Sequence, residues 1–142
     1  PQIAAGLRDP DPSVRRDSAG TLGRLGPAAH TAVSGLMIML LDPETRTRVI
    51  AASSLKKIGR AAIPGLMQGL EHANAELRGR CATLLGQIAP DDPQVAEALR
   101  IVVADGDAEV RRRAGEALTL TPGPVATPAP IESQEFEFAW VG

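Results

Sequence analysis

The feature that most constrains the fold of this chain is an internal repeat of about 32 residues. Each repeat opens on an arginine that follows an apolar residue or a threonine, and small or apolar residues then recur at helical spacings. The opening pairs, separated by 33, 30 and 33 residues, are Val14 and Arg15, Thr47 and Arg48, Leu77 and Arg78, and Val110 and Arg111. A fixed period of this length predicts an array of similar units stacked on one another.

A second set of apolar pairs keeps the same period and ends seven residues before each opening pair. These pairs are Ile3 and Leu7, Leu36 and Leu40, Leu66 and Leu70, and Leu99 and Val103. Apolar spacings of three and four residues are typical of amphipathic helices. We therefore expect each unit to hold two helices, a leading helix and a returning helix, and no strand interrupts this pattern over residues 1–120.

Polar residues and glycines predict where these helices begin and end. Asp11, Asn74 and Asp107 precede leading helices, and their side chains are suited to accept from free amide groups of the first turn. Gly26 and Gly59 are placed where leading helices should end. The returning helices are expected to end at Asp9, Asp42, His72 and Asp105.

A two-helix unit buries only part of its apolar surface alone, so such units gain stability by stacking. We therefore predict an all-α fold over residues 1–120, a short right-handed α-solenoid of helical hairpins. Residues 1–8 match only the second half of a returning helix, which makes the first repeat partial. From this we expect the chain to be a fragment of a longer protein.

The repeat resembles the HEAT-like repeat family, in the short form found in phycobilisome-lyase-type repeats. The resemblance covers residues 1–120 and implies that an Asp before each leading helix and an Arg in its first turn stack along the superhelix. The matching positions are Asp11, Asp107, Arg15, Arg48, Arg78 and Arg111, with Glu44 and Asn74 where the family usually has Asp. The resemblance is specific for fold and leaves function open, because such folds host many unrelated tasks.

The residues that usually carry chemistry are few and scattered. The two histidines, His30 and His72, and the single cysteine, Cys81, fall in different repeats without the spacing of a metal site. Cys81 is expected in the core and His72 in a surface turn. We therefore predict no catalytic residue, no metal and no cofactor, and we do not expect an enzyme.

Charge offers a second class of function, nucleic-acid binding. The whole chain has 15 basic and 17 acidic side chains, so no global field draws it to nucleic acid or to anionic lipid. Additional arginines could still neutralise phosphates along the repeats, namely Arg16, Arg80, Arg112 and Arg113. The competing interpretation, which the near balance of charge favours, is that the arginines pair with acids of their own or the next repeat.

The returning helices carry more apolar residues than a core requires. Residues 36–41 read LMIMLL, and a single helix cannot turn all six toward one face. We predict an apolar strip that suits a partner protein, built from Ile38, Met39, Gly69, Ile101 and Val102. The alternative is that helix tilt buries these residues or that they are exposed one by one.

The sequence changes character after residue 120. Residues 121–130 read TPGPVATPAP, which predicts a semi-rigid linker. In residues 131–142 the aromatic side chains of Phe136, Phe138 and Trp140 alternate with Glu135, Glu137 and Ala139, so an extended segment presents its aromatics on one side. Such a segment suits docking onto a protein or addition to a sheet.

These observations predict a non-catalytic protein-interaction scaffold whose partner is another protein or a neighbouring copy of the same chain. Two alternatives stay open: binding of a nucleic-acid backbone through the arginines, and a lyase-like or chaperone-like helper that holds a ligand in a groove near His30. The sequence has no run of eighteen apolar residues and no charged leader, so no membrane contact is expected and a cytoplasmic location is favoured.

Overall fold

The computed structural model describes residues 2–121, and within them the chain is all α-helical with short 3₁₀ segments and no strand. The elements are α1 (Gln2–Ala5), η1 (Gly6–Arg8), α2 (Pro12–Leu25), η2 (Gly26–Ala32), α3 (Val33–Met39), α4 (Thr45–Ile58), η3 (Gly59–Ala62), α5 (Ile63–Gly69), α6 (Ala75–Ile88), α7 (Pro93–Val102) and α8 (Ala108–Thr119). The predicted α-solenoid of helical hairpins is confirmed. The predicted linker beyond Thr121 and the predicted docking segment lie outside the described residues.

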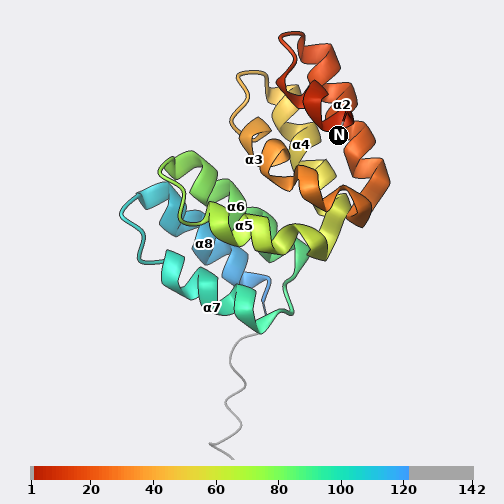
Figure 1. The fold of residues 1–142 in the computed structure, drawn as a ribbon. Helices are drawn as coiled ribbons and strands as arrows, with labels where there is room; N and C mark the ends of the chain where they lie inside the picture. The colour runs from red at the N-terminus through yellow and green to blue at the C-terminus, as the bar shows by residue number, and fades with distance from the viewer. Residues whose placement is uncertain (1, 122–142) are drawn as a thin grey trace, which may run out of the picture.

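The hairpins stack so that their leading helices lie side by side. Figure 1 shows α2 beside α4 at one end of the molecule and α6 beside α8 at the other. The returning helices α3, α5 and α7 cover the leading helices from one side, and α1 with η1 forms the end of the returning helix of a partial first repeat. The two-layer arrangement follows from the two apolar sets in the sequence, one for each layer.

One continuous aliphatic core joins the hairpins. It extends from Leu7 to Ala117 and contains the second-set leucines Leu36, Leu66 and Leu99 at full burial. No aromatic residue occurs between residues 2 and 121, so Leu, Ile, Val, Met and Ala fill this core. These side chains are small, and the helix axes can therefore approach closely.

The predicted capping residues lie at the helix N-termini, except that Glu44 makes no capping bond, and Asp92 is an additional cap. The side chains of Asp11, Asn74 and Asp107 accept amide hydrogen bonds in the first turns of α2, α6 and α8. Glu44 occupies the same position before α4 but makes no capping bond, and its carboxylate accepts from the Thr47 hydroxyl instead. Asp92 caps α7 through the amides of residues 94 and 95, which the sequence reading did not anticipate.

Glycine permits the closest contacts between leading helices. A Cβ placed on Gly23 of α2 would lie 2.8 Å from the Ser54 hydroxyl oxygen and 3.0 Å from its Cα on α4. A Cβ on Gly86 of α6 would lie 2.7 Å from the Cβ of Ala117 on α8. Eight residues after its repeat arginine, each of these helices therefore needs a residue without a side chain.

The repeat formed by α4 and α5 lacks this glycine. Lys56 occupies the equivalent position in α4 and is exposed. Consistent with this substitution, α4 and α6 touch far less extensively than α2 and α4 or α6 and α8. The solenoid thus consists of two tightly stacked pairs of repeats joined by a looser junction.

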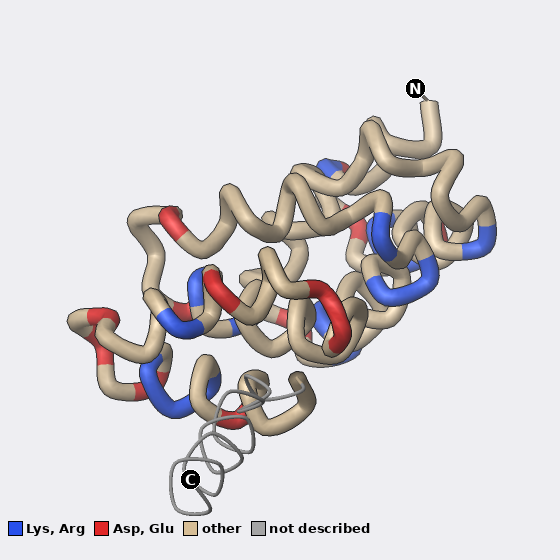
Figure 2. Tube along the Cα trace, turned by 90° about the horizontal axis from the view of Figure 1, so that it is seen from below, with Lys and Arg blue, Asp and Glu red and all other residues tan. Residues whose placement is uncertain are grey.

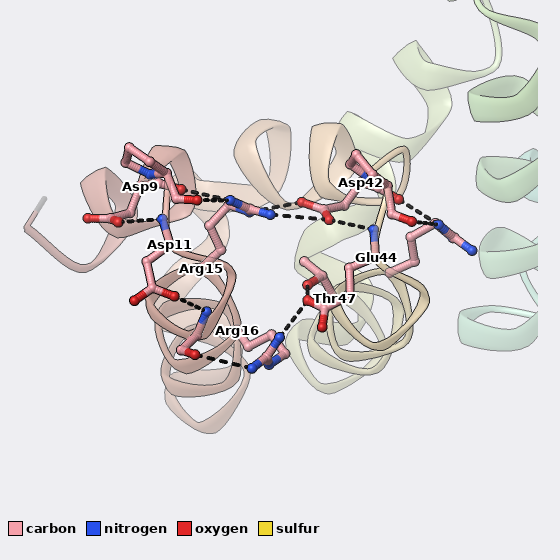
Figure 3. A network of polar contacts seen from close by, with 11 residues as sticks. Asp9, Asp11, Arg15, Arg16, Asp42, Glu44 and Thr47 are labelled. Atoms are coloured by element: carbon pink, nitrogen blue, oxygen red, sulfur yellow. Dashed lines mark hydrogen bonds and ion pairs between the residues drawn. The ribbon is translucent and has the colours of Figure 1, made fainter.

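Arginines connect the loops of successive repeats (Figure 3). Arg15 donates through Nη1 to the carbonyl of Asp9, 2.9 Å away in its own loop, and through Nε to Oδ2 of Asp42, 2.9 Å away in the next loop. Arg78 repeats the arrangement, with 2.9 Å to the carbonyl of His72 and 3.0 Å to the Asp105 carboxylate. The Arg78 guanidinium, together with the amide of residue 107, holds the pKa of Asp105 below its usual value. For Arg15 and Arg78, this confirms the interpretation that repeat arginines pair with acids of the neighbouring repeat, whereas Arg111 binds the carbonyl of Asp105 in its own loop.

The loop-to-loop pairing is interrupted at the same junction. Arg48 binds the carbonyl of Asp42 at 2.6 Å and the Thr45 hydroxyl at 2.8 Å, so it keeps the contacts to its own loop. The next loop carries His72 where the other loops carry Asp. His72 preserves the turn, because its Nδ1 accepts from the amide of Asn74 at 3.0 Å, but it offers no carboxylate to a preceding arginine.

The close contact at Gly86 predicts an unusual response to alanine. Gly86→Ala should lower the free energy of unfolding by about 1–3 kcal/mol, because the new methyl group clashes with Ala117. The matched control is Gly115→Ala in α8, where a Cβ meets no atom within 4 Å. That change should raise stability by up to about 1 kcal/mol through helix propensity alone. Urea unfolding followed by circular dichroism measures both, and stabilisation by both changes would contradict the proposed contact.

The loop pairing predicts a selective effect of removing one charge. Asp105→Asn keeps an acceptor for the turn but loses the ion pair with Arg78, and should cost about 1 kcal/mol at neutral pH. Asp9→Asn is the matched control, because Asp9 makes the same turn contact but no ion pair within residues 2–121. The folded-state pKa of Asp105 is lowered, so its contribution is complete above the unfolded pKa of about 3.9 and is lost as pH falls through the folded value. Equal losses for the two variants, or a difference that persists at low pH, would argue against the pairing.

Candidate interaction surfaces

The returning helices expose part of the apolar strip that the sequence predicts. Ile38 on α3 is 60% exposed and Ile101 on α7 is 69% exposed, so both are available to a partner. Met39 and Val102 are only 3% and 8% exposed, and Gly69 is also buried. The expectation that these three residues are exposed is therefore corrected, although Val102 still contributes to the lining of a hollow between α5 and α7.

The phase of each returning helix explains this correction. Residues 39 and 102 directly follow the exposed isoleucines and turn about 100° further around the helix, toward the core. Gly69 faces inward as well, since a Cβ there would lie 2.4 Å from Sγ of Cys81 and 2.7 Å from the methyl of Met37. What remains exposed is one isoleucine on each of two helices.

Each of these isoleucines borders a shallow hollow. The first hollow, about 560 Å³, lies between the α1–η1 segment and α3 and is lined by Ala4, Leu7, Gly35 and Ile38 among others. The second, about 650 Å³, lies between α5 and α7 and is lined by Met67, Gln68, Ala98 and Ile101 among others. We call these two hollows with their isoleucines the returning-helix face.

The four arginines predicted as possible phosphate ligands all form ion pairs. Within the described residues, Arg16 pairs with Glu44, Arg80 with Glu76, Arg112 with Glu109 and Glu116, and Arg113 with Glu109 and Glu76. The guanidinium groups of Arg112 and then Arg113 lower the pKa of Glu109 to about 2. The hydroxyl of Thr47 is the main cause of the lowered pKa of Glu44, followed by Arg16. A phosphate at any of these arginines would have to displace a carboxylate.

The remaining candidates for chemistry lie apart from one another. Cys81 is fully buried, as expected, and burial raises the pKa of its thiol to about 12. His30 is exposed, with Nδ1 3.3 Å from the carbonyl of Pro27, and does not line either hollow. Among residues 2–121 no cluster of three or more His, Cys, Asp or Glu side chains is placed to hold a metal ion. In the same part of the chain, no helix has the length and apolar character needed to span a bilayer.

A further hollow between α2 and α4 was missed by the sequence analysis. Its volume is about 490 Å³, and it is lined by Arg16, Asp17, Gly20, Arg24, Arg46, Ile50, Ser53, Ser54 and Lys57. We call it the basic groove. The sequence feature that points to this groove is an uneven distribution of charge along the chain. Residues 2–70 contain nine basic and five acidic side chains, whereas residues 71–121 contain six basic and nine acidic side chains.

The aromatic residues Phe136, Phe138 and Trp140 lie outside the described residues. Their predicted role in binding a partner therefore stays a prediction.

Comparison with known sequences identifies the repeat. The model of the family described as HEAT repeats matches residues 63–129. Residues of this chain are also 33% identical over 84 positions to the urease accessory protein UreD of Sorangium cellulosum (strain So ce56). That match covers 59% of this chain and 27% of the relative, so the chain spans about a quarter of the length of this curated protein.

Solved structures share the architecture at low sequence identity. One, described by the words "TOG-tubulin binding specificity promotes microtubule dynamics and mitotic spindle formation", has a TM-score of 0.66 at 17% identity and covers 83% of this chain and 57% of its own. A designed armadillo repeat protein in complex with the peptide (KR)4 has a TM-score of 0.51 at 16% identity and covers 84% and 63%. This chain therefore covers less than two thirds of each of these two structures. With its stacked hairpins and its loop arginines, this chain has the fold of HEAT-like repeat proteins, and residues 63–129 match the family model itself.

Proposed function

We propose that this chain is a non-catalytic module that binds a protein partner on its returning-helix face. The observation that carries the proposal is the exposure of Ile38 and Ile101 beside two hollows, on helices whose other faces are buried in the core. Apolar side chains of a partner that enter these hollows would contribute roughly 1.5–3 kcal/mol each by burial. Two such anchors, set on separate rigid helices, suit an extended or helical partner segment better than a small ligand.

The fold supports this reading. Repeat solenoids are typical interaction scaffolds, because stacked units present a long, regular surface. The similar structures include one concerned with tubulin binding and one holding a peptide, which supports a protein as the class of partner. The urease accessory relative matches over too little of its own length to indicate which partner this chain binds.

Residues 131–142 are the second contact site in this proposal. Burying Phe136, Phe138 and Trp140 would remove roughly 500 Å² of apolar surface from water, about 12 kcal/mol at roughly 25 cal/mol per Å². Ordering the seven residues 136–142, which contain these aromatics, costs about 1–2 kcal/mol per residue. Gain and cost are similar, so this segment is expected to make a weak contact that matters when a second contact acts with it.

Nucleic-acid binding through Arg16, Arg80, Arg112 and Arg113 stays the alternative. It requires salt-dependent retention on duplex DNA. The ion pairs that already occupy these side chains argue against it. A ligand-holding role near His30 has no lining of converging polar groups to support it in the described residues.

Charge introduced on the returning-helix face should weaken partner binding. Ile38→Glu or Ile101→Glu is expected to leave the fold intact, because both side chains are exposed, and to weaken retention of the partner at least about tenfold, since it places a charge against an apolar contact. Val49→Glu is the matched control: Val49 is 61% exposed but lies on the leading helix α4. Quantitative affinity capture compares the three variants with wild type. A partner that is lost with all three variants, or that is retained by all three, would contradict the proposal that it binds the returning-helix face.

Deletion of residues 131–142 should separate binding from folding. The aliphatic core from Leu7 to Ala117 already joins the hairpins of residues 2–121, so helical content and cooperative unfolding should be nearly unchanged. Association with a partner or with a second copy should weaken. Circular dichroism with urea unfolding measures the first effect and analytical ultracentrifugation the second. Collapse of the fold on deletion would instead make the aromatic residues part of the core.

A further inference from the structure

The basic groove lies between two leading helices, away from the returning-helix face. Its lining contains four basic side chains, Arg16, Arg24, Arg46 and Lys57, and one acid, Asp17. Arg16 is engaged by Glu44, which neutralises it. Among the described residues, Arg24, Arg46 and Lys57 form no ion pair, and all three are exposed. Three cations of the groove are thus available to an anionic ligand.

The floor of the groove is small and partly apolar. Ile50 is half-buried there, and Gly20 lacks a side chain, so that a Cβ would meet only the Arg24 guanidinium at 3.7 Å. The Ser54 hydroxyl is buried and already donates to the carbonyl of Ala19 at 2.7 Å. Cationic walls around such a floor suit a ligand that combines carboxylates with apolar or aromatic groups, because arginine side chains also stack on aromatic rings.

Charge is distributed unevenly along the solenoid. Residues 2–70 have a net charge of +4 and residues 71–121 a net charge of −3. Figure 2 shows the basic residues gathered mainly toward the end of the molecule that carries the N-terminus. Residues 122–142 contain three glutamates and no base, and they follow directly on the acidic half. Electrostatic complementarity therefore directs this segment away from the repeats to which it is attached and toward the first half.

We propose that the basic groove is the docking site of residues 131–142 of this same chain. The aromatic side of the extended segment contacts Ile50 and the guanidinium planes, and the negative charges of Glu135 and Glu137 attract the segment to the unpaired cations of the groove, which include Arg46 and Lys57. The proposal rests on the proposed function, since it assigns a place to the segment treated there as a contact site. A nucleic-acid backbone fits less well, because it needs a longer row of unpaired cations and does not use an apolar floor.

The single tryptophan makes this proposal directly measurable. Trp140 is the only Trp of the chain and there is no Tyr, so the fluorescence of the full-length chain reports on residues 131–142 alone. Docking should shift Trp140 emission to shorter wavelength and protect it from quenching by acrylamide. Salt at about 1 M, where the Debye length is about 3 Å, should reverse both effects.

Two adjacent lysines give a matched pair of variants. Lys57 lines the groove and Lys56, its neighbour on α4, does not, although both are exposed. Lys57→Glu should raise acrylamide quenching of Trp140 severalfold, to the level seen at high salt, whereas Lys56→Glu should behave as wild type. Circular dichroism checks that both variants are folded, and Lys57→Gln, which removes charge without reversing it, should give an intermediate result. Signals that are independent of protein concentration would support docking of the segment on its own chain, and signals that depend on protein concentration would overturn that assignment in favour of a second copy.

Several outcomes would overturn the proposal. Trp140 that is fully accessible at low salt, or equal effects of Lys56→Glu and Lys57→Glu, would show that the groove does not hold the segment. Retention on duplex DNA that is lost only in Lys57→Glu, with Trp140 accessible throughout, would assign the groove to phosphates instead. No partner is present in these measurements, and Ile38→Glu should leave the Trp140 signal unchanged. Failure here is therefore distinct from failure of partner binding at the returning-helix face.

Discussion

Close approach between leading helices is the constraint on which the rest of this structure depends. Gly23 and Gly86 let α2 meet α4 and α6 meet α8 with almost no space between the backbones. With the helices so close, the arginine of one repeat reaches the loop aspartate of the next and forms the Arg15–Asp42 and Arg78–Asp105 pairs. Packing and loop pairing therefore support each other, and both are needed because a single hairpin buries too little apolar surface to be stable alone.

The junction between the α4–α5 repeat and the α6–α7 repeat lacks both the close helix contact and the loop pairing. There Lys56 replaces the glycine and His72 replaces the aspartate, and the repeat spacing shortens to 30 residues because η3 is shorter than η2. The exposed pair Arg60–Asp91 crosses this junction in place of a half-buried one. Since local stability follows buried contacts, we expect this junction to open before the contacts between α2 and α4 and between α6 and α8. The second hollow of the returning-helix face spans this junction, between α5 and α7, so its shape depends on how the two halves meet.

The sequence pattern predicted the features that recur in each repeat. It did not predict the features that depend on how each helix is rotated about its own axis in the packed structure. Opening arginines, capping acids and apolar pairs recur at fixed intervals, and these revealed the helices and the loop pairing. Whether Met39 and Val102 face inward depends on the rotation of α3 and α7 against their neighbours, which a sequence pattern of adjacent apolar residues leaves undetermined. The basic groove escaped notice because its cations come from two helices, and because acids in the second half hide the excess in the total charge.

The two candidate surfaces differ in chemistry and lie on different layers, which has a consequence for how the chain binds. The returning-helix face is apolar, so its contacts should be little affected by salt, whereas the basic groove acts through charge that salt screens. A segment docked in the groove leaves Ile38 and Ile101 free, so it does not compete with a partner on the other layer. It does, however, withdraw Phe136, Phe138 and Trp140 from that partner. Docking therefore regulates how many contacts the partner makes rather than whether it binds, and the effect on avidity is largest at low ionic strength.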